Sequence, residues 1–389
     1  MSLADSISDV GSKATRRWLS FDPVLAITTL ILIVFGLMSV LSVEKSLFTK
    51  QALLLGIGFV PFMIAFTIPP AIWQRLSWLL YMINVGMLLL VMFMGNSKGG
   101  AQRWIDIGPI GFQPSEMSKF LTVLTVTTFF VHRGDDLRSF STLLLSLLHV
   151  IPVVLLIAIQ PHYAAAASVL VGWIAVAIVV RVNWKHMAIL FVAMSVLLGG
   201  YSAVSGKSLL RGYHMDRIGA LFTGIKTGKK DTQGQDFQVN RGLISIGIGG
   251  ASGQGYLQGE FKGAAFVPEQ ENDLIFSVIG QEWGFAGSIF LLTLYLVFFL
   301  RGWQLCLKME DLWSRSVCLA LLAVMAFHWT VNMAMNLGIG PVIGLWLPFI
   351  SYGGTALWVC LMMVGLILNL NSIQSEEQFS RGAPKAWMR

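Results

Sequence analysis

Apolar residues gather in runs of about 20 along most of the chain, and short polar stretches separate the runs. A helix of about 20 residues crosses the roughly 30 Å hydrocarbon core of a bilayer, so each run predicts a transmembrane helix. About ten spans result, at 22–44, 51–70, 75–95, 117–132, 141–160, 163–181, 186–204, 273–300, 314–337 and 345–370. The alternating pattern of membrane barrel strands does not occur. The pattern therefore predicts an all-α polytopic membrane protein.

Composition supports that class. The 389 residues are 55% hydrophobic and 12% charged, whereas a soluble domain carries about 25% charged residues. The first apolar run is as long as a full span and lacks a small-residue cleavage site, so we interpret it as a retained helix and not as a signal peptide. The three cysteines and six histidines show no metal-ligand or disulfide spacing.

Lysine and arginine collect in the cytoplasmic loops of membrane proteins. With the N-terminus inside, the inner segments hold Lys13, Arg16, Arg17, Arg75, Arg133, Arg138, Arg181, Lys185, Arg301, Lys308, Arg315, Arg381, Lys385 and Arg389. The short outer loops hold only Lys45, Lys50, Lys98 and Arg103. This asymmetry predicts cytoplasmic tails at 1–21 and 372–389 around a single transmembrane domain at 22–371. The net charge of +7 then anchors the chain in the membrane and does not indicate nucleic-acid binding.

Most of the hydrophilic residues fall in two outer segments, 96–116 and a large loop at about 205–272 between the seventh and eighth spans. Long loops in compact domains are usually functional or disordered. The apolar, glycine-rich run at 244–250 predicts a segment that dips into the membrane interface. The alternative is a solvated connector.

Ionisable residues at membrane depth are costly and usually functional. Asp273 opens the eighth span, either as a helix N-cap or as a carboxylate of raised pKa that acts as a general base. Glu282 lies deeper in the same span. Glu116 and Lys119 lie three residues apart on the fourth span and are able to pair, with a structural or a catalytic role.

Three polar residues, His328, Asn332 and Asn336, recur every four positions and therefore share one face of the ninth span. Hydrogen bonds between helices explain this spacing, and a ligand-binding role is the alternative.

Four motifs, in order along nearly the whole chain, resemble signatures of the SEDS family, which includes RodA and FtsW. They are Arg103-Trp104 followed by QPSE at 113–116 with Lys119, the pattern GG-x-x-G-x-G at 249–255, Pro268-Glu269 with Asn272-Asp273, and PV-x-G-x-x-LPFISYGG at 341–354. Each motif alone is weak. Together with the number of spans and the position of the large loop they are specific to the family.

The resemblance implies a peptidoglycan polymerase, an inverting glycosyltransferase that joins lipid II into glycan strands at the outer face of the bacterial cytoplasmic membrane. Asp273 matches the family's essential carboxylate. It would deprotonate the 4-hydroxyl of the acceptor sugar, which attacks the anomeric carbon of a strand held on undecaprenyl pyrophosphate.

The departing diphosphate needs cations as its charge develops. The candidates for binding substrate or diphosphate are Arg103, Glu116, Lys119, Arg211, Arg217, Lys262 and Glu282. A divalent cation such as Mg²⁺ would share this role, although the sequence shows no dedicated metal site.

The resemblance also implies a partner, the class B penicillin-binding protein that crosslinks the strand. The short tails and the PVIG run favour RodA-like elongation and cell shape over FtsW-like division.

One motif departs from the family. Its QPD before the sixth span is Gln160-Pro161-His162 here, so Gln160 and His162 become candidate positioning residues.

Two other functions stay open. A lipid II flippase would show polar residues through the whole bundle and often inverted repeats, whereas here the charges gather at the outer boundary and no repeat between the halves is visible. A non-catalytic scaffold for the wall machinery is the other alternative, kept open by His162.

Overall fold

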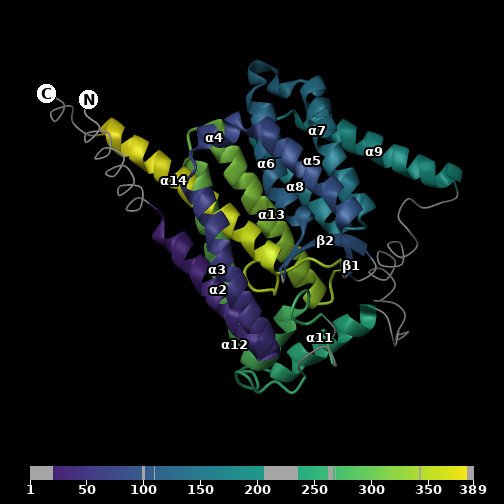
Figure 1. The fold of residues 1–389 in the computed structure, drawn as a ribbon, viewed down its shortest axis with the longest axis vertical. Helices are drawn as coiled ribbons and strands as arrows, with labels where there is room; N and C mark the ends of the chain where they lie inside the picture. The colour runs from purple at the N-terminus through teal and green to yellow at the C-terminus, as the bar shows by residue number, and fades with distance from the viewer. Residues whose placement is uncertain are drawn as a thin grey trace.

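The computed structural model describes residues 21–98, 101–108, 110–205, 235–261, 266–267, 269–340 and 343–382. Helices dominate it (Figure 1). They are α2 (Pro23–Val43), α3 (Lys45–Thr67), α4 (Pro70–Arg75), α5 (Ser77–Met94), α6 (Pro114–Val131), α7 (Phe140–Ile159), α8 (Tyr163–Val179), α9 (Trp184–Ser205), α11 (Gln235–Gly249), α12 (Ile275–Lys308), α13 (Leu312–Asn336) and α14 (Gly354–Gly382). A short 3₁₀ helix, η1 (Gly134–Arg138), precedes α7.

The predicted spans are confirmed as helices. Seven of them, α2, α3, α5, α7, α12, α13 and α14, are long and apolar enough to cross a membrane. The other three coincide with α6, α8 and α9. Helix α8 and the first part of α9 are apolar but shorter, and α6 carries the buried charges of Glu116 and Lys119. The protein is thus an all-α polytopic membrane protein.

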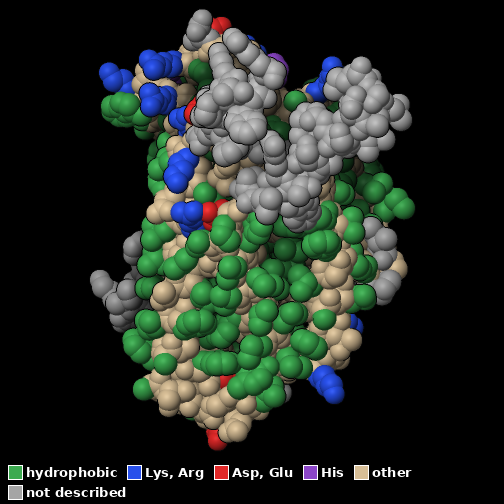
Figure 2. Space-filling view, turned by 90° about the vertical axis from the view of Figure 1, so that its left-hand side faces the viewer, with side chains coloured by type: hydrophobic (Ala, Val, Ile, Leu, Met, Phe, Trp, Pro, Cys, Tyr) green, Lys and Arg blue, Asp and Glu red, His purple; other side chains and the backbone are tan. Residues whose placement is uncertain are grey.

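Hydrophobic side chains cover the middle of the molecule. Figure 2 shows them as a broad band on one face, with Lys and Arg side chains gathered mainly toward its upper end. The outer helices contribute strongly exposed apolar residues, such as Phe93 at 83% and Leu53 at 60% exposure. Lipid chains replace water as the solvent for such a surface, and helices satisfy their backbone hydrogen bonds internally.

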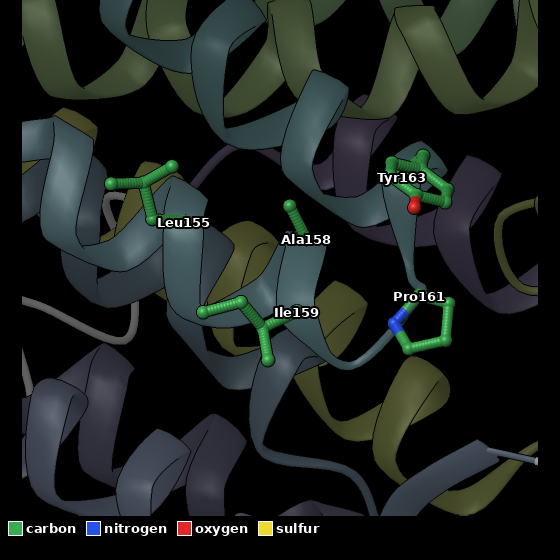
Figure 3. A pocket seen from close by; sticks show the side chains of 5 residues that line it. All are labelled: Leu155, Ala158, Ile159, Pro161 and Tyr163. Atoms are coloured by element: carbon green, nitrogen blue, oxygen red, sulfur yellow. The ribbon is translucent and has the colours of Figure 1, made fainter. Parts of the chain in front are cut away.

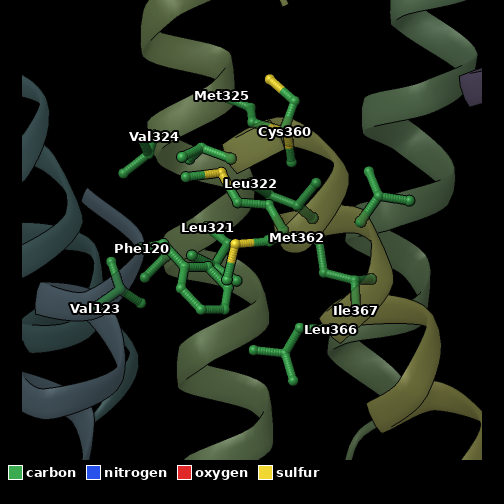
Figure 4. Close-up of a cluster of buried hydrophobic side chains, with 14 of the residues drawn as sticks. Phe120, Val123, Leu321, Leu322, Val324, Met325, Cys360, Met362, Leu366 and Ile367 are labelled. Carbon is green, nitrogen blue, oxygen red and sulfur yellow. The ribbon is translucent and has the colours of Figure 1, made fainter. Parts of the chain in front are cut away.

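The core lies where α6, α13 and α14 meet (Figure 4). Phe120 of α6, Leu321 and Met325 of α13, and Cys360 and Leu366 of α14 are all buried there. Because α6 is surrounded by other helices, its polar residues are shielded from lipid, and this position allows it to carry an ion pair inside the bundle.

Two predicted spans are irregular at the end of the molecule where Asp273 lies. Helix α14 begins at Gly354 and not at 345, because the preceding segment is irregular, with positive φ at Gly344 and Phe349. Helix α12 breaks at Gly284, whose φ of 62° and ψ of −157° suit glycine far better than an L-residue. The break separates the first turns of α12 from its long apolar part.

A small antiparallel sheet, missed by the sequence analysis, forms in the shorter polar segment. Its strands β1 (Asn96–Lys98), β2 (Ala101–Ile107) and β3 (Ile110–Phe112) lie in the order β1-β2-β3. Trp104 pairs with Asn96, and Ile105 pairs with Phe112. The sheet leads directly into α6 and fixes the start of that helix.

The glycine-rich run of the large loop lies at the end of α11, which packs against α12. Ser245 is buried, and Gly249 approaches the backbone of α12 so closely that a Cβ atom there would lie 1.9 Å from the carbonyl oxygen of Gly280. This packing excludes a solvated connector for α11. The insertion of this segment into the membrane interface stays a prediction.

Gly249→Ala is expected to lower the melting temperature, because its Cβ would overlap a backbone atom that no rotamer change moves. Overpacking of this kind costs about 1–3 kcal/mol. Thermal unfolding of the purified protein, followed by tryptophan fluorescence, measures the change. Gly247→Ala is the matched control in the same helix, since a Cβ there meets nothing within 4 Å. Equal melting temperatures for the two variants would contradict the close approach.

Candidate active site

Asp273 lies in the turn that leads into α12. The backbone N–H groups of Asn272 and Asp273 donate to the carbonyl oxygen of Glu269, at 3.2 and 3.1 Å. The N-cap of α12 is Leu274, and no side chain caps the helix. The N-cap interpretation of Asp273 is therefore wrong, and its carboxylate is available for another role.

Two asparagines of α13 hold this turn in place. The side-chain amides of Asn332 and Asn336 both donate to the backbone carbonyl of Asp273 at 2.9 Å, and Asn332 also donates to the carbonyl of Leu345 at 2.7 Å. These bonds join α13 to the starts of α12 and of the irregular segment before α14. The predicted hydrogen-bonding role of this face of α13 is confirmed.

The carboxyl group of Asp273 has a pKa raised to about 7. Burial is the largest cause, and the negative charges of Glu269 and Glu271 add to it. Gly344 leaves room beside it, since a Cβ at that position would lie 3.4 Å from Asp273 Oδ2. A carboxyl group with a pKa near the working pH is suited to general base catalysis.

The Glu116–Lys119 pair lies inside the bundle, 2% and 0% exposed. Lys119 Nζ donates to both carboxylate oxygens, at 2.8 and 2.7 Å, and the predicted pairing is confirmed. Trp346 Nε1 donates to the same carboxylate at 2.8 Å. His328 Nε2 lies 3.0 Å from Lys119 Nζ, and an ammonium group has only donors, so this ring nitrogen accepts. The cluster is electrically neutral, and both of its charged groups are hydrogen-bonded.

His162 belongs to a second polar group, next to the first along α6. Its Nδ1 lies 3.2 Å from Gln113 Nε2 and 2.9 Å from Ser115 Oγ. Because the Gln113 amide is a donor, Nδ1 accepts and the proton sits on Nε2. Burial lowers the pKa of His162 well below its usual value, and the positive charges of Lys119 and Arg103 lower it further. His162 is therefore neutral at pH 7.

The remaining candidates lie in different places. Arg103 Nε donates to the carbonyl of Gln160 at 3.0 Å, and Gln160 Nε2 donates to the carbonyl of Leu88 at 3.0 Å. Both residues brace the α7–α8 turn. Glu282 accepts a hydrogen bond from Ser42 at the end of α2, away from the Glu116 cluster. Arg211, Arg217 and Lys262 lie outside the described residues.

Two members of the buried cluster, Trp346 and Ser168, were not predicted from the sequence. Trp346 occupies an unspecified position of the closing motif, and nothing in the sequence relates it to Glu116. Ser168, whose Oγ lies 3.1 Å from His328 Nε2, is a single polar residue in an apolar helix, and that contrast is the one available signal. Among the described residues, no group of three or more His, Cys, Asp or Glu side chains is placed to hold a metal ion.

An apolar recess of about 310 Å³ lies at the α7–α8 turn, next to Gln160 and His162 in the chain (Figure 3). Leu155, Ile159 and Tyr163 line it, together with Ala158 and Pro161. Ile159 is 63% exposed, so the recess opens on the lipid-facing surface close to the end of the bundle.

The fold and the site define a polytopic helical membrane protein with a carboxyl group of pKa near 7 at one end and an ion pair buried inside the bundle. The sequence model of the cell cycle proteins FtsW, RodA and SpoVE matches residues 17–376. The chain belongs to this family.

Individual relatives agree. The chain is 27% identical to peptidoglycan glycosyltransferase MrdB of Escherichia coli K12, over 90% of this chain and 93% of that protein. It is 31% identical to stage V sporulation protein E of Bacillus subtilis, over 92% and 98%. A solved structure described as a peptidoglycan synthase complex that coordinates polymerization and crosslinking contains a chain of 27% identity, with a TM-score of 0.79 over 92% of this chain and 99% of that chain. A crystal structure of a mutant of the rod shape determining protein RodA from Thermus thermophilus matches with 25% identity and a TM-score of 0.66, over 91% and 98%.

Proposed function

We propose that this protein is a peptidoglycan glycosyltransferase that joins lipid II into glycan strands at the outer face of the cytoplasmic membrane. The observation that carries the proposal is Asp273, a carboxyl group with a pKa near 7 at one end of the bundle, in a family with relatives named for this activity. The test supplies the purified protein and its transpeptidase partner with labelled lipid II and separates the polymer by gel electrophoresis.

In the proposed reaction, Asp273 removes the proton of the acceptor's 4-hydroxyl. The oxygen attacks the anomeric carbon of the strand, the bond to the diphosphate breaks, and the centre inverts from α to β. The diphosphate leaves with the bonding electron pair, and cations stabilise its charge. Arg103, Arg211, Arg217 and Lys262 stay candidates for that role, and a divalent cation such as Mg²⁺ would share it.

Lys119 has a different role in this proposal. It is fully buried, and Glu116 matches its charge. We propose that the pair shapes the floor of the site and does not contact the diphosphate. The neutral His162 and the backbone-bound Gln160 position the α7–α8 turn beside it. Glu282 would support the start of α12 through Ser42. The apolar recess at that turn would receive part of a lipid chain.

We further propose a RodA-like role in elongation, with a class B penicillin-binding protein as partner. The similar chain in a complex that coordinates polymerization and crosslinking supports the partner. A lipid II flippase, an FtsW-like division polymerase and a non-catalytic scaffold are the alternatives. Movement of labelled lipid II across vesicles without polymer would favour the flippase.

The rate of polymerisation is expected to depend on pH through the ionisation of the Asp273 carboxyl group. The rate rises through about pH 7 as the carboxyl group loses its proton and becomes a base. The negative charge of Glu269 helps to raise this pKa. Glu269→Gln removes that charge, lowers the pKa of Asp273 and shifts the rise of the pH–rate profile to lower pH. A profile that keeps its midpoint, or shifts upward, would argue against Asp273 as the titrating group.

The proposed orientation places Asp273 outside and both tails in the cytoplasm. Cysteine at Glu260, an exposed position in the large loop, is expected to react with a membrane-impermeant maleimide on whole cells. Cysteine at Glu310, an exposed position beyond the far end of α12, is expected to react only after the cells are opened. The native Cys306, Cys318 and Cys360 are buried and give little background. The reverse labelling pattern would invert the topology.

A further inference from the structure

A polar cavity of about 210 Å³ lies at the opposite end of the bundle from Asp273. It is formed where α2 begins and where α12 and α14 approach their ends. Its polar lining consists of Asp22, Arg301, Lys308, Asn371, Gln374 and Ser375. Figure 1 places the described ends of the chain together on this side of the molecule, away from α11. The cavity is therefore separate from the proposed active site.

Among the described residues that line the cavity, Asp22 supplies the only carboxylate, and this carboxylate is already hydrogen-bonded. Asp22 accepts from Arg301 Nε at 3.1 and 3.0 Å, and its Oδ1 also accepts from the backbone N–H of Leu25 at the start of α2, at 2.9 Å. Burial acts to raise the pKa of Asp22, but the hydrogen bonds from Arg301 and Leu25 and the charges of Arg301 and Lys308 outweigh it and lower the pKa. Asp22 is thus ionised at neutral pH and balances a single cation.

The described lining of the cavity holds two cations and one carboxylate. Within the described part of the chain, Lys308 has no ion-pair or hydrogen-bond partner for its ammonium group. Gln374 accepts from the backbone N–H of Glu310 at 3.3 Å, while its buried Nε2 donates to nothing. A buried donor without a partner is unfavourable. With Lys308 and Arg301 against Asp22, the lining carries a net positive charge.

We infer that this cavity binds a phosphate group, with Lys308 as its cationic donor. A phosphate offers several acceptor oxygens and the negative charge that balances Lys308. The cavity lies at the ends of transmembrane helices, the level at which phospholipid headgroups are found, and basic pockets between helices on the cytoplasmic side bind anionic headgroups. An anionic phospholipid and free phosphate share this chemistry.

Binding at this cavity would join α2, α12 and α14 at one point. A ligand that binds only the folded state raises the melting temperature. The experiment compares the full chain in nanodiscs of phosphatidylcholine with nanodiscs that also contain phosphatidylglycerol. A parallel series in detergent adds inorganic phosphate. Tryptophan fluorescence follows unfolding in each case.

Phosphatidylglycerol is expected to raise the melting temperature of the wild-type protein by several degrees, and Lys308→Gln is expected to lose most of that increase. In phosphatidylcholine, whose phosphate is balanced by its own choline cation, Lys308→Gln is expected to change the melting temperature much less, because it removes only the attraction between Lys308 and Asp22. Lys185→Gln, an exposed lysine near the start of α9 at the same end, keeps the full increase and controls for general surface charge.

A Lys308-dependent increase with inorganic phosphate alone would support the site with a soluble phosphate as its source. Equal increases for the wild-type protein and Lys308→Gln, or no increase with either ligand, would overturn the inference. Neither result depends on polymerisation, so failure of the phosphate site and failure of the proposed enzymatic function are distinguishable.

Discussion

Asp273→Asn is expected to reduce glycan polymerisation from lipid II by at least about 100-fold, because general base catalysis contributes about 10²–10⁴-fold. Asparagine keeps the size of the side chain but has no basic oxygen. The turn around it depends on backbone atoms, since Asn332 and Asn336 bind the carbonyl group of Asp273 and not its carboxylate. The variant is therefore expected to fold, and its loss of activity to arise in the chemical step.

Glu271→Gln is the matched control. Its backbone carbonyl accepts from the N–H of Tyr352 at 2.9 Å, a bond that the substitution preserves, and its side chain lies two positions from Asp273. It is expected to retain polymerisation and to shift the pH dependence in the same direction as Glu269→Gln. Both variants are compared by melting temperature before their rates are measured. Wild-type rates from a folded Asp273→Asn protein would exclude Asp273 as the base.

The sequence predicted the architecture well because the bilayer imposes a simple length rule on apolar segments. It predicted the Glu116–Lys119 pair from spacing alone, since residues three apart share a helix face. It placed Asp273 at the start of a span, but it did not distinguish a helix cap from a free carboxylate. That difference depends on whether a backbone N–H of the helix donates to the Asp273 side chain, and in the structure none caps it.

The contacts that complete the site come from distant parts of the chain. Trp346 reaches Glu116 across 230 positions, and His328 reaches Lys119 across 209. No local period encodes such pairs. The small sheet was missed for a related reason: its strands are short, and the sequence around them is rich in glycine and resembles a loop.

Lys119→Met is expected to destabilise the protein strongly, because it leaves the carboxylate of Glu116 buried without its counter-ion. Removal of one partner from a buried ion pair costs about 3–5 kcal/mol. The hydrogen bond from Trp346 remains, but a single neutral donor does not replace the ammonium group that binds both oxygens. The expected result is a large fall in melting temperature in detergent, with loss of polymerisation as the site loses its support.

The double variant Glu116→Gln/Lys119→Met separates a structural role from a catalytic one. It removes both charges, and neutral replacement of a buried pair is often close to neutral in stability. The double variant is expected to regain most of the melting temperature that Lys119→Met loses. A double-mutant cycle gives the coupling free energy between the two residues. If the pair only shapes the floor of the site, polymerisation recovers together with stability. Recovery of stability without polymerisation would instead show that Lys119 or Glu116 takes part in the reaction, and it would return Lys119 to the residues that bind the diphosphate.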